Sequence, residues 1–403
     1  MSILFYTQHV LGMGHLFRSL AVAQALGPET VHLITGGAEA PAALPPHVRH
    51  LPLPPLMMDA DFSQLHLGDG SEHDPARREE LVAARFMERT TRLRHAFADL
   101  APDLLLVELY PFGRKRFGQE IQPLLEDARN AGVPVVCSLR DILVEKKDQD
   151  AYERRVLEML HRHFSGLLVH SDPTLFPLDA TFERAADIAI PLAYSGYVAP
   201  DPVPEAARHA WRASAGLSPE ESLVLASIGG GAVGLDLMRC ILEASYVLRT
   251  TRPHRLLAFA GPFMAEAEFR TLQQLAAGAP WMTLERFTPH FQEWLAVADC
   301  SVSLAGYNTV MGVLAQGTPA LVLPFDQNRE QRLRATALAG RGLLELLHPA
   351  ELEPAHLAAR LDACLHGRQH VHTRAAPREA PIDLNGAAAS ARILRGWRQS
   401  WRC

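Results

Sequence analysis

One pattern recurs over most of the 403 residues: a short run rich in Ile, Leu and Val, then a loop, then a segment with helical periodicity. This alternation is typical of βαβ units, in which helices join neighbouring parallel strands and cover the sheet. The pattern predicts an α/β protein built on doubly wound parallel sheets. Ligands of such sheets bind at the carboxyl ends of the strands, so polar residues that follow a strand are the first candidates for function.

In the first half we expect strands at residues 3–7, 31–35, 48–53, 104–109, 133–139 and 166–170, and helices at 16–26, 77–100, 117–131 and 151–164. A proline-rich stretch at 191–204 has the composition of a linker. The second half is expected to hold strands at 223–228, 255–260, 282–287, 301–304 and 320–324, and helices at 235–249, 265–276, 291–297, 309–316, 329–339, 354–366 and 384–401.

The length favours two domains, because a domain typically takes roughly 100 to 200 residues. We place the first at residues 1–200 and the second at 201–372, followed by a segment at 373–403 that ends in the last helix. Two doubly wound domains would direct their strand ends toward a common cleft.

Charge and cysteine content restrict the partners and the compartment. The chain has 39 basic and 45 acidic residues and a net charge of -6, so it lacks the basic field that nucleic acid requires. The only lysines are Lys115, Lys146 and Lys147. The five cysteines are scattered and odd in number, which is typical of free thiols in a reducing compartment, and we expect a cytoplasmic protein. These cysteines are Cys137, Cys240, Cys300, Cys364 and Cys403.

No targeting segment or apolar run of membrane-spanning length is recognisable, so any membrane contact is expected to be peripheral.

The first predicted strand is followed by GMGHLFR at residues 12–18. Glycines at a strand-to-helix turn allow close approach of a ligand, and the free N–H groups at the helix start favour an anion. A third glycine and a ribose-binding acid are missing, so the segment is not a dinucleotide fingerprint. His15 at this turn is a candidate general base. The alternative is a histidine that packs or caps the helix.

Charged residues also follow other strands of the first half: Glu108, the pair Arg140 and Asp141, and His170 with Asp172. Charges at the ends of apolar strands are costly unless they serve a ligand or one another. Glu108 is expected to orient His15 and stabilise its protonated form, as a carboxylate does in hydrolytic triads. Arg140, Asp141 and Gly14 are acceptor-side candidates, that is, candidates for binding the molecule from which His15 would remove a proton. An ion pair between Arg140 and Asp141 within the sheet is an equally good interpretation of those two residues.

Three segments of the second half combine a strand end with a polar turn. Residues 227–232 read SIGGGA, whose consecutive glycines expose N–H groups that can hold phosphate, although a plain tight turn is the alternative. It is not a P-loop, because no Gly-Lys-Ser/Thr follows. Residues 303–309 read SLAGYNT, where Gly306 and the Thr309 hydroxyl form a second anion site. Residues 324–331 read PFDQNREQ, with an acid and an amide suited to sugar hydroxyls.

The order of these segments resembles the carboxyl-terminal donor domain of the GT-B glycosyltransferases. The resemblance is carried by GGGA at 229–232, Phe287 before a short helix, AGYNTVMGVLAQGTPALVLPF at 305–325 and EQ at 330–331. The pattern is most similar to that of the peptidoglycan N-acetylglucosaminyltransferase group and of relatives described only as predicted glycosyl transferases, which share segments like PFG (111–113) and SLRDI (138–142). The GxGHxxR start is similar too, so the resemblance covers most of the chain.

The resemblance implies two Rossmann-like domains, a nucleotide-diphosphate sugar held mainly by the second and an acceptor held by the first. It also implies that the reaction needs no metal or other cofactor and that the final helix returns to the first domain. The donor-binding positions that it implies are Gly230, Gly231, Phe287, Thr288, Gly306, Tyr307, Asn308, Thr309, Glu330 and Gln331. In the family pattern the glycine turns bind the diphosphate, the Phe-Thr pair lies near the nucleobase, and the Glu-Gln pair binds the sugar hydroxyls. His15 matches the histidine that many inverting members use as a base.

One position departs from the family pattern. Members usually have a ribose-binding glutamate in the helix after the GYNT-like turn, and this chain has Gly312 there. Asn308 and Gln316 lie one helical turn to either side, so an amide is a candidate for the ribose contact.

Other features are weaker signals of function. Asp59 and Asp61 form a DxD sequence, but no strand precedes it, and we expect no metal there. His366, His370 and His372 lie in a turn-rich segment and are expected to be solvated. The long irregular stretch at 54–75 fits either an acceptor lid or a plain loop.

These features predict an inverting, metal-independent hexosyl- or N-acetylhexosaminyltransferase that uses a nucleotide-diphosphate sugar, with UDP as the expected nucleotide. Two alternatives stay open. The first is hydrolysis of a nucleotide sugar with His15 activating water, because a UDP-sugar hydrolase of the pseudaminic acid pathway shares the GxGHxxR start. The second is nucleotide-sugar binding without catalysis, which Gly312 suggests.

Overall fold

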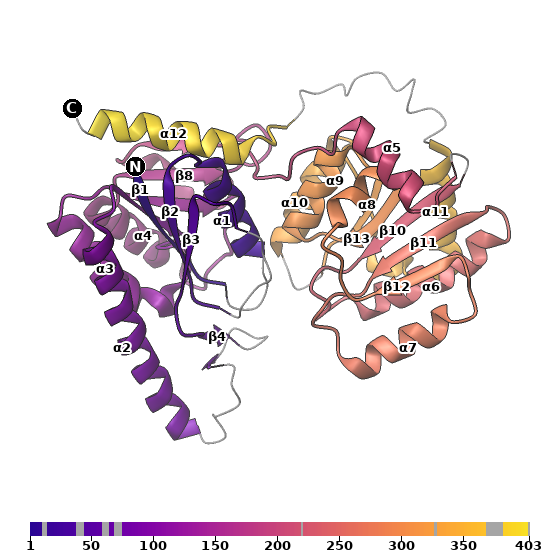
Figure 1. The fold of residues 1–403 in the computed structure, drawn as a ribbon, viewed down its shortest axis with the longest axis horizontal. Helices are drawn as coiled ribbons and strands as arrows, with labels where there is room; N and C mark the ends of the chain where they lie inside the picture. Colours follow the sequence, from indigo (N-terminus) through magenta and orange to yellow (C-terminus); the bar gives the residue numbers. More distant parts are fainter. Residues whose placement is uncertain are drawn as a thin grey trace. The chain divides into compact units, whose positions relative to one another are not determined.

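The computed structural model describes residues 1–9, 14–37, 44–58, 64–67, 75–218, 221–325, 329–367 and 382–401. Its contacts divide the chain into two compact units (Figure 1). Unit 1 comprises Met1–Val198 together with Ile382–Cys403, and unit 2 comprises Ala199–Pro381. The first unit is therefore discontinuous in sequence.

Unit 1 contains a seven-stranded parallel sheet and a short antiparallel pair. The sheet strands are β1 (Ser2–Thr7), β2 (Thr30–Thr35), β3 (Val48–Pro52), β6 (Leu104–Glu108), β7 (Val135–Arg140), β8 (Gly166–His170) and β9 (Leu192–Tyr194). Their spatial order is β3-β2-β1-β6-β7-β8-β9. The antiparallel pair is β4 (Met57–Met58) with β5 (Leu65–His66), within the irregular stretch noted in the sequence.

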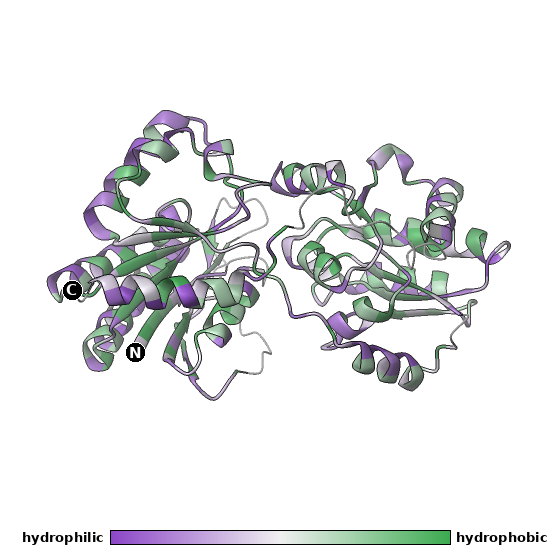
Figure 2. Cartoon of the chain, turned by 90° about the horizontal axis from the view of Figure 1, so that it is seen from above, coloured by the Kyte–Doolittle hydropathy of each residue, from purple (hydrophilic) through white to green (hydrophobic). Residues whose placement is uncertain are grey.

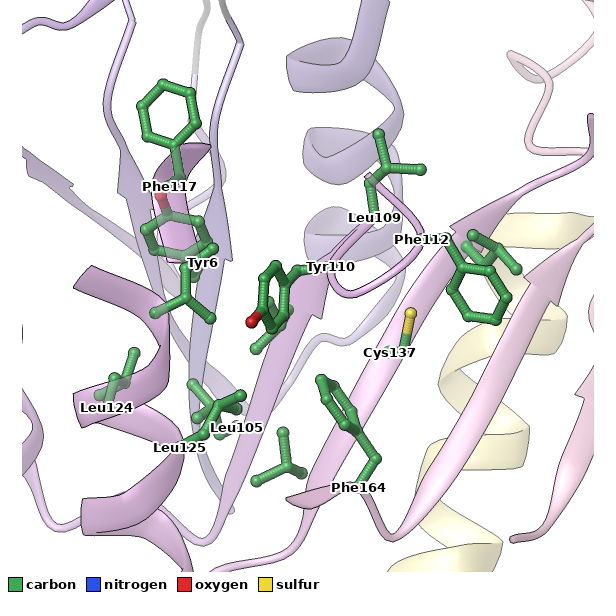
Figure 3. Close-up of a cluster of buried hydrophobic side chains, with 14 of the residues drawn as sticks. Tyr6, Leu105, Leu109, Tyr110, Phe112, Phe117, Leu124, Leu125, Cys137 and Phe164 are labelled. Carbon is green, nitrogen blue, oxygen red and sulfur yellow. The ribbon is translucent and has the colours of Figure 1, made fainter. Parts of the chain in front are cut away.

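Helices cover both faces of this sheet. They are α1 (Gly14–Ala25), α2 (Pro75–Leu100), α3 (Gly118–Asn130), α4 (Gln149–His163) and α12 (Gly386–Trp401), with 3-10 turns η1 (Lys115–Phe117), η2 (Leu178–Ala180) and η3 (Glu183–Asp187). Side chains alternate along each strand, so β1 contributes to two cores. Ile3 and Phe5 pack with α1 and α12. Leu4 and Tyr6 pack with α2, α3 and α4, in the cluster that Figure 3 shows.

Unit 2 repeats the plan with six parallel strands. They are β10 (Ser222–Ser227), β11 (His254–Phe259), β12 (Met282–Glu285), β13 (Cys300–Leu304), β14 (Ala320–Leu323) and β15 (Glu345–Leu346), in the order β12-β11-β10-β13-β14-β15. The helices are α5 (Glu205–Ser214), α6 (Leu235–Arg249), α7 (Glu266–Ala276), α8 (Phe291–Val297), α9 (Tyr307–Gln316), α10 (Arg329–Gly340) and α11 (Pro354–Gly367), with a 3-10 turn η4 (Pro349–Glu351). Apolar side chains of α6, α7 and α11 bury one face of the sheet. Figure 2 shows the predominantly hydrophobic strands of both sheets.

The predicted doubly wound α/β class is confirmed, and most strands and helices lie within a few residues of their expected bounds. The expectation that 191–204 is only a linker was wrong at its start, because β9 pairs there with β8 as an edge strand. Pro191, which lacks an N–H, lies just before that strand, a position that proline tolerates. Helix α5 and strand β15 had not been expected. Both are short, and a short element offers few positions from which a periodicity can be recognised.

Within the described ranges, none of the helices combines the length and apolar character that a membrane span requires. Cys137, Cys240 and Cys300 are buried free thiols and Cys364 is partly buried. Cys403 lies outside the described residues.

The winding of each sheet determines where polar loops can meet. In unit 1 the chain proceeds outward through β1, β2 and β3 and then returns to place β6 on the other side of β1. In unit 2 it proceeds through β10, β11 and β12 and returns to place β13 beside β10. Successive helices leave such a switch point toward opposite faces, and a crevice forms at the carboxyl ends of the two central strands.

A buried guanidinium holds the carboxyl ends of three strands of unit 1. Arg89 of α2 is fully buried and donates to the Oε atoms of Glu120 at 2.7 Å. It also donates to Gln8 Oε1 after β1 at 2.6 Å, to the Gly36 carbonyl after β2 at 2.9 Å and to the Pro54 carbonyl after β3 at 2.7 Å. All three nitrogens of the planar fork are engaged, which a lysine cannot reproduce.

Arg89→Lys is expected to lower the free energy of unfolding by about 3 kcal/mol or more, because an ammonium leaves the buried carboxylate and carbonyls incompletely paired. Urea unfolding followed by circular dichroism measures the change. The matched control is Arg92→Lys on the same helix, whose exposed side chain bonds only Glu88. If both variants unfold at the wild-type midpoint, the Arg89 network does not stabilise unit 1.

Candidate functional site

The switch point of unit 1 brings His15 and Glu108 together. His15 lies in the first turn of α1, and Glu108 is the last residue of β6, which pairs with β1. His15 Nδ1 lies 2.6 Å from Glu108 Oε1. The carboxylate is fully buried, whereas the histidine side chain is 21% exposed. The pair therefore consists of a fixed carboxylate and an imidazole that solvent can reach.

Glu108 carries a charge at neutral pH and His15 does not. Burial alone raises the pKa of Glu108, but its contacts with His15 and Arg18 outweigh burial and hold the net pKa below its usual value. Burial lowers the pKa of His15, and the opposite effect of Glu108 is too small to compensate. A neutral imidazole that donates its Nδ1 proton to a carboxylate has its lone pair on Nε2, which is the form of a general base.

Two arginines beside Glu108 had not been assigned a role from the sequence. Arg18, one turn after His15 on α1, donates to Glu108 Oε1 at 2.5 Å and is buried. The three-residue spacing between His15 and Arg18 places both side chains on the same face of a helix, and this spacing was the sequence feature that could have indicated their proximity. Arg114, in the loop after β6, contributes a positive charge that lowers the pKa of Glu108 and of His15. Sequence reasoning could not see that this loop turns back toward the strand end.

The acceptor-side candidates lie at the same edge of the sheet. Gly14 begins α1, Arg140 ends β7 half-buried, and Asp141 follows it fully buried. His170 is instead a structural residue, because its ring lies 2.7 Å from Ser138 Oγ and 2.9 Å from Ser195 Oγ in a fully buried position. Asp172 accepts from the backbone N–H of Asp383, which ties the returning chain to unit 1.

In unit 2 the two expected anion-binding turns follow β10 and β13, the pair at its switch point. Gly229, Gly231 and Gly234 all have positive φ, which explains the glycines of the first turn. Gly230 is exposed, and its carbonyl accepts from Phe263 N–H at 2.9 Å. Gly231 is buried, and a Cβ there would lie 2.4 Å from the Ala260 carbonyl oxygen. Close backbone packing therefore requires glycine at 231.

The second turn ends in a helix whose N-terminus lacks a side-chain cap. Gly306 is the N-cap residue of α9 and, as a glycine, offers no side chain to cap the helix. Gly306, Tyr307, Asn308 and Thr309 are all half-buried, and a Cβ on Gly306 would meet only Thr309 Oγ1 at 4.0 Å. The ring of Tyr307 packs under the buried guanidinium of Arg334 at 5.0 Å. The open turn and the uncapped helix are suited to an anion.

The remaining donor-side candidates differ in exposure. Phe287 is 50% exposed, and Thr288 Oγ1 accepts from the His290 N–H. Glu330 is buried at the start of α10, and Gln331 Oε1 accepts from the Phe325 N–H at 3.0 Å. Gln331 thus also holds the backbone at Phe325, just after β14.

Of the two amides that the sequence offers for the ribose contact, Asn308 and Gln316, the second is engaged within the protein. Gln316 is 4% exposed, its Oε1 accepts from Val203 N–H, and its Nε2 donates to the Asp201 carbonyl. These backbone bonds fix the start of unit 2 and leave the amide unavailable. A Cβ on Gly312 would lie 3.0 Å from the amide of Gln292, so that amide lies beside the position of the missing side chain. Asn308 stays a candidate for the ribose contact.

Several sequence features lie outside the described residues: Gly12, Met13, Asp59, Asp61, His370, His372 and residues 326–328 of the PFDQNREQ segment. His366 is described, and its ring lies within hydrogen-bond distance of Arg252 and of the Asp362 carbonyl. Among the described side chains, no three His, Cys, Asp or Glu residues converge in a way that could hold a metal ion.

Comparison with known proteins bears on both units. Residues 225–387 match the glycosyltransferase family 28 C-terminal domain. The chain is 23% identical over 197 residues to an uncharacterised glycosyltransferase of Methanopyrus kandleri, covering 49% of this chain and 51% of the relative. It is 27% identical over 249 residues to the UDP-N-acetylglucosamine–N-acetylmuramyl-(pentapeptide) pyrophosphoryl-undecaprenol N-acetylglucosamine transferase of Symbiobacterium thermophilum, covering 60% of each. The matched region thus spans about half to three fifths of these relatives.

Solved structures are similar over nearly the whole chain. The calicheamicin glycosyltransferase CalG4 aligns with a TM-score of 0.57 at 16% identity, covering 98% of both chains. MurG of Acinetobacter baumannii aligns with a TM-score of 0.53 at 17% identity, covering 97% of this chain and 94% of MurG. Phytolacca americana UGT2, complexed with UDP-2-fluoro-glucose and pterostilbene, aligns with a TM-score of 0.59 at 14% identity over 100% of both. The resemblance carried by the motifs is confirmed: the chain has the GT-B fold, and residues 225–387 match the glycosyltransferase family 28 C-terminal domain.

Proposed function

We propose that this chain is an inverting glycosyltransferase that moves a sugar from a nucleotide-diphosphate donor, UDP-linked, to a nucleophilic acceptor. The observation that carries the proposal is the hydrogen bond between His15 Nδ1 and the buried carboxylate of Glu108. The family 28 match over residues 225–387 and the relatives named as glycosyltransferases support it. Phytolacca americana UGT2, whose complex contains UDP-2-fluoro-glucose, has the same fold, which supports UDP as the nucleotide.

In this proposal His15 is the catalytic base of unit 1. Glu108 holds the proton on Nδ1, so Nε2 accepts the proton of the acceptor hydroxyl as its oxygen attacks the anomeric carbon. The C–O bond to the diphosphate breaks as the new glycosidic bond forms on the opposite face, which inverts the configuration. Arg18 keeps the Glu108 carboxylate ionised and in place, and we regard it as a positioning residue.

Unit 2 serves the donor in this proposal. The uncapped N-terminus of α9 and the exposed turn at Gly230 meet the charge that develops on the leaving diphosphate. Preorganised N–H groups and a helix dipole can supply this stabilisation without a cation, so we propose a reaction that needs no metal. Phe287 and Thr288 contact the nucleobase of the donor in this proposal, and Glu330 and Gln331 contact its sugar.

UDP is expected to stabilise the protein more than dTDP, GDP or CDP, by about 2.7 kcal/mol when present at a hundred times its dissociation constant. Thermal unfolding measures the ranking. Gly306→Val should abolish the shift, because its side chain projects into the open space over the α9 N-terminus. Gly340→Val, also at an open position in unit 2, is the matched control. If no nucleotide raises the unfolding temperature at millimolar concentration, the donor site is refuted.

His15→Gln is expected to lower the rate of UDP release from UDP-sugars by a factor of about 10² to 10⁴, because the reaction loses its general base. The assay uses a panel of UDP-sugars with a cell extract as the source of acceptor. His95→Gln, an exposed histidine of α2, should keep full activity. Full activity of His15→Gln would contradict the assignment. Stoichiometric free sugar from donor alone would instead identify a hydrolase.

The rate should change little between pH 8 and pH 6. The neutral form of His15 is the active base, and burial lowers its pKa, so it stays neutral at pH 6. A histidine with the ordinary pKa near 6.5 would be only about one quarter neutral at that pH. We therefore expect kcat/KM to fall by less than about twofold across this interval. A fourfold loss by pH 6 would show that the His15 pKa is not lowered.

A further inference from the structure

A cavity of about 470 Å³ opens in unit 1 between the loop after β6 and the start of α4. Its lining includes Phe112, Arg114, Lys115, Lys146, Tyr152 and Arg155. Phe112 and Arg114 belong to the loop that begins directly after Glu108, Lys115 begins the 3-10 turn η1 that follows it, and Lys146 belongs to the loop after β7. The cavity thus lies at the carboxyl edge of the sheet, on the same side as His15.

Positive charge dominates this lining. Four cationic side chains face one carboxylate, Asp148, which caps α4 by accepting from Ala151 N–H at 3.0 Å. The other acids of this helix start are engaged elsewhere: Asp150 pairs with Arg154 and Arg184, and Glu153 accepts from the N–H groups of Glu183 and Arg184. Lys115 and Arg155 form no ion pair with any described side chain. The cavity therefore carries a net positive charge in an acidic protein.

Arg114, which lines the cavity, has hydrogen-bonding capacity that its protein surroundings do not fill. Its Nε and Nη2 atoms are buried without a hydrogen-bond partner among the described residues. Its φ of 57° lies in the left-handed region, which non-glycine residues adopt at a cost of about 1 to 2 kcal/mol. Burial lowers the pKa of Arg114, and the nearby Glu108 only partly offsets this. A buried guanidinium with free donors is costly unless an acceptor reaches it.

The lysines of the chain give a second, independent signal. The chain has three, at 115, 146 and 147, and two of them line this cavity although 31 residues separate them in sequence. Apart from Lys147, every other basic residue of Lys or Arg type in the chain is arginine. A lysine ammonium is a compact point charge on a flexible side chain, and it commonly binds phosphate oxygens. The planar guanidinium of arginine adapts its direction less easily.

The wall of the cavity is rigid. Tyr152 is buried, and its hydroxyl donates to the Phe112 carbonyl at 2.8 Å, which ties α4 to the loop after β6. The Lys146 ammonium and the Arg155 guanidinium lie 5.8 and 5.6 Å from the Tyr152 ring centroid. Cation–π attraction of this kind keeps both charges beside the cavity.

We propose that this cavity binds a phosphate group carried by the acceptor, held by Arg114, Lys115, Lys146 and Arg155. This inference rests on the proposed function, because it identifies the phosphate-bearing ligand as the acceptor. A phosphate here is held by the positive charges of the lining and lies beside the loop that continues from Glu108. Binding therefore places the acceptor near the His15 base.

Isothermal titration with inorganic phosphate and glucose 1-phosphate tests the proposal, at fixed ionic strength and with saturating UDP so that any phosphate site of unit 2 is filled. The Lys115→Gln/Arg155→Gln double variant should weaken binding at least tenfold. Lys147→Gln removes the same charge one residue from Lys146 but outside the cavity lining, and should change binding by less than twofold. Equal affinities in wild type and double variant, or an equal loss in Lys147→Gln, would overturn the site.

A second arm distinguishes the source of the phosphate. Vesicles of phosphatidylcholine with and without phosphatidic acid are sedimented with the wild type and the double variant. If glucose 1-phosphate binds more tightly than inorganic phosphate, the acceptor is soluble. If the wild type sediments with vesicles that contain phosphatidic acid and the double variant does not, the acceptor is a lipid. UDP stabilisation of the double variant should equal that of the wild type. If neither the wild type nor the variants bind UDP, the proposed function is refuted. The phosphate titration would still measure binding in the cavity.

Discussion

The pairing of β1 with β6 is the constraint on which the polar architecture of unit 1 depends. Parallel strands end at one edge, and the reversal of winding between these two strands sends their helices to opposite faces. The gap left at that edge is where an imidazole from α1 can reach a carboxylate from β6. Burying that carboxylate in turn requires Arg18, because an uncompensated charge among apolar strands is costly.

The sequence predicted the features that depend on local pattern. Continuous apolar runs located every strand of four or more residues, and the glycine turns located the starts of α1, α6 and α9. His15 and Glu108 could be paired in advance because a doubly wound sheet places successive strand ends at one edge. The contacts of Arg114 and Gln316 could not be predicted, because their surroundings come from distant segments. The backbone around 201–203 occupies the Gln316 amide, and no periodicity in α9 encodes that contact.

Two buried arginines of unit 1 illustrate how context changes one residue type. Arg89 has acceptors at every nitrogen and joins three strand ends to two helices. Arg114 has a strained backbone and buried donors that lack acceptors. Their pattern in the sequence is the same, a basic residue near an apolar element. Only the arrangement of acceptors separates a structural cation from one available to a ligand.

The return of the chain to unit 1 affects how the protein is made. Helix α12 supplies Ala391 and Leu394 to the core beneath β1, and the Trp397 ring lies 2.8 Å from where a Cβ on Gly166 would be. Until that helix leaves the ribosome, this face of the first sheet is covered only in part, by α1. The 203 residues between Val198 and the end of α12 take about 10 to 40 s to synthesise at usual rates. Unit 2 can therefore complete its fold on the ribosome before unit 1, although unit 1 is translated first, and the nascent chain exposes part of an apolar sheet face during that interval.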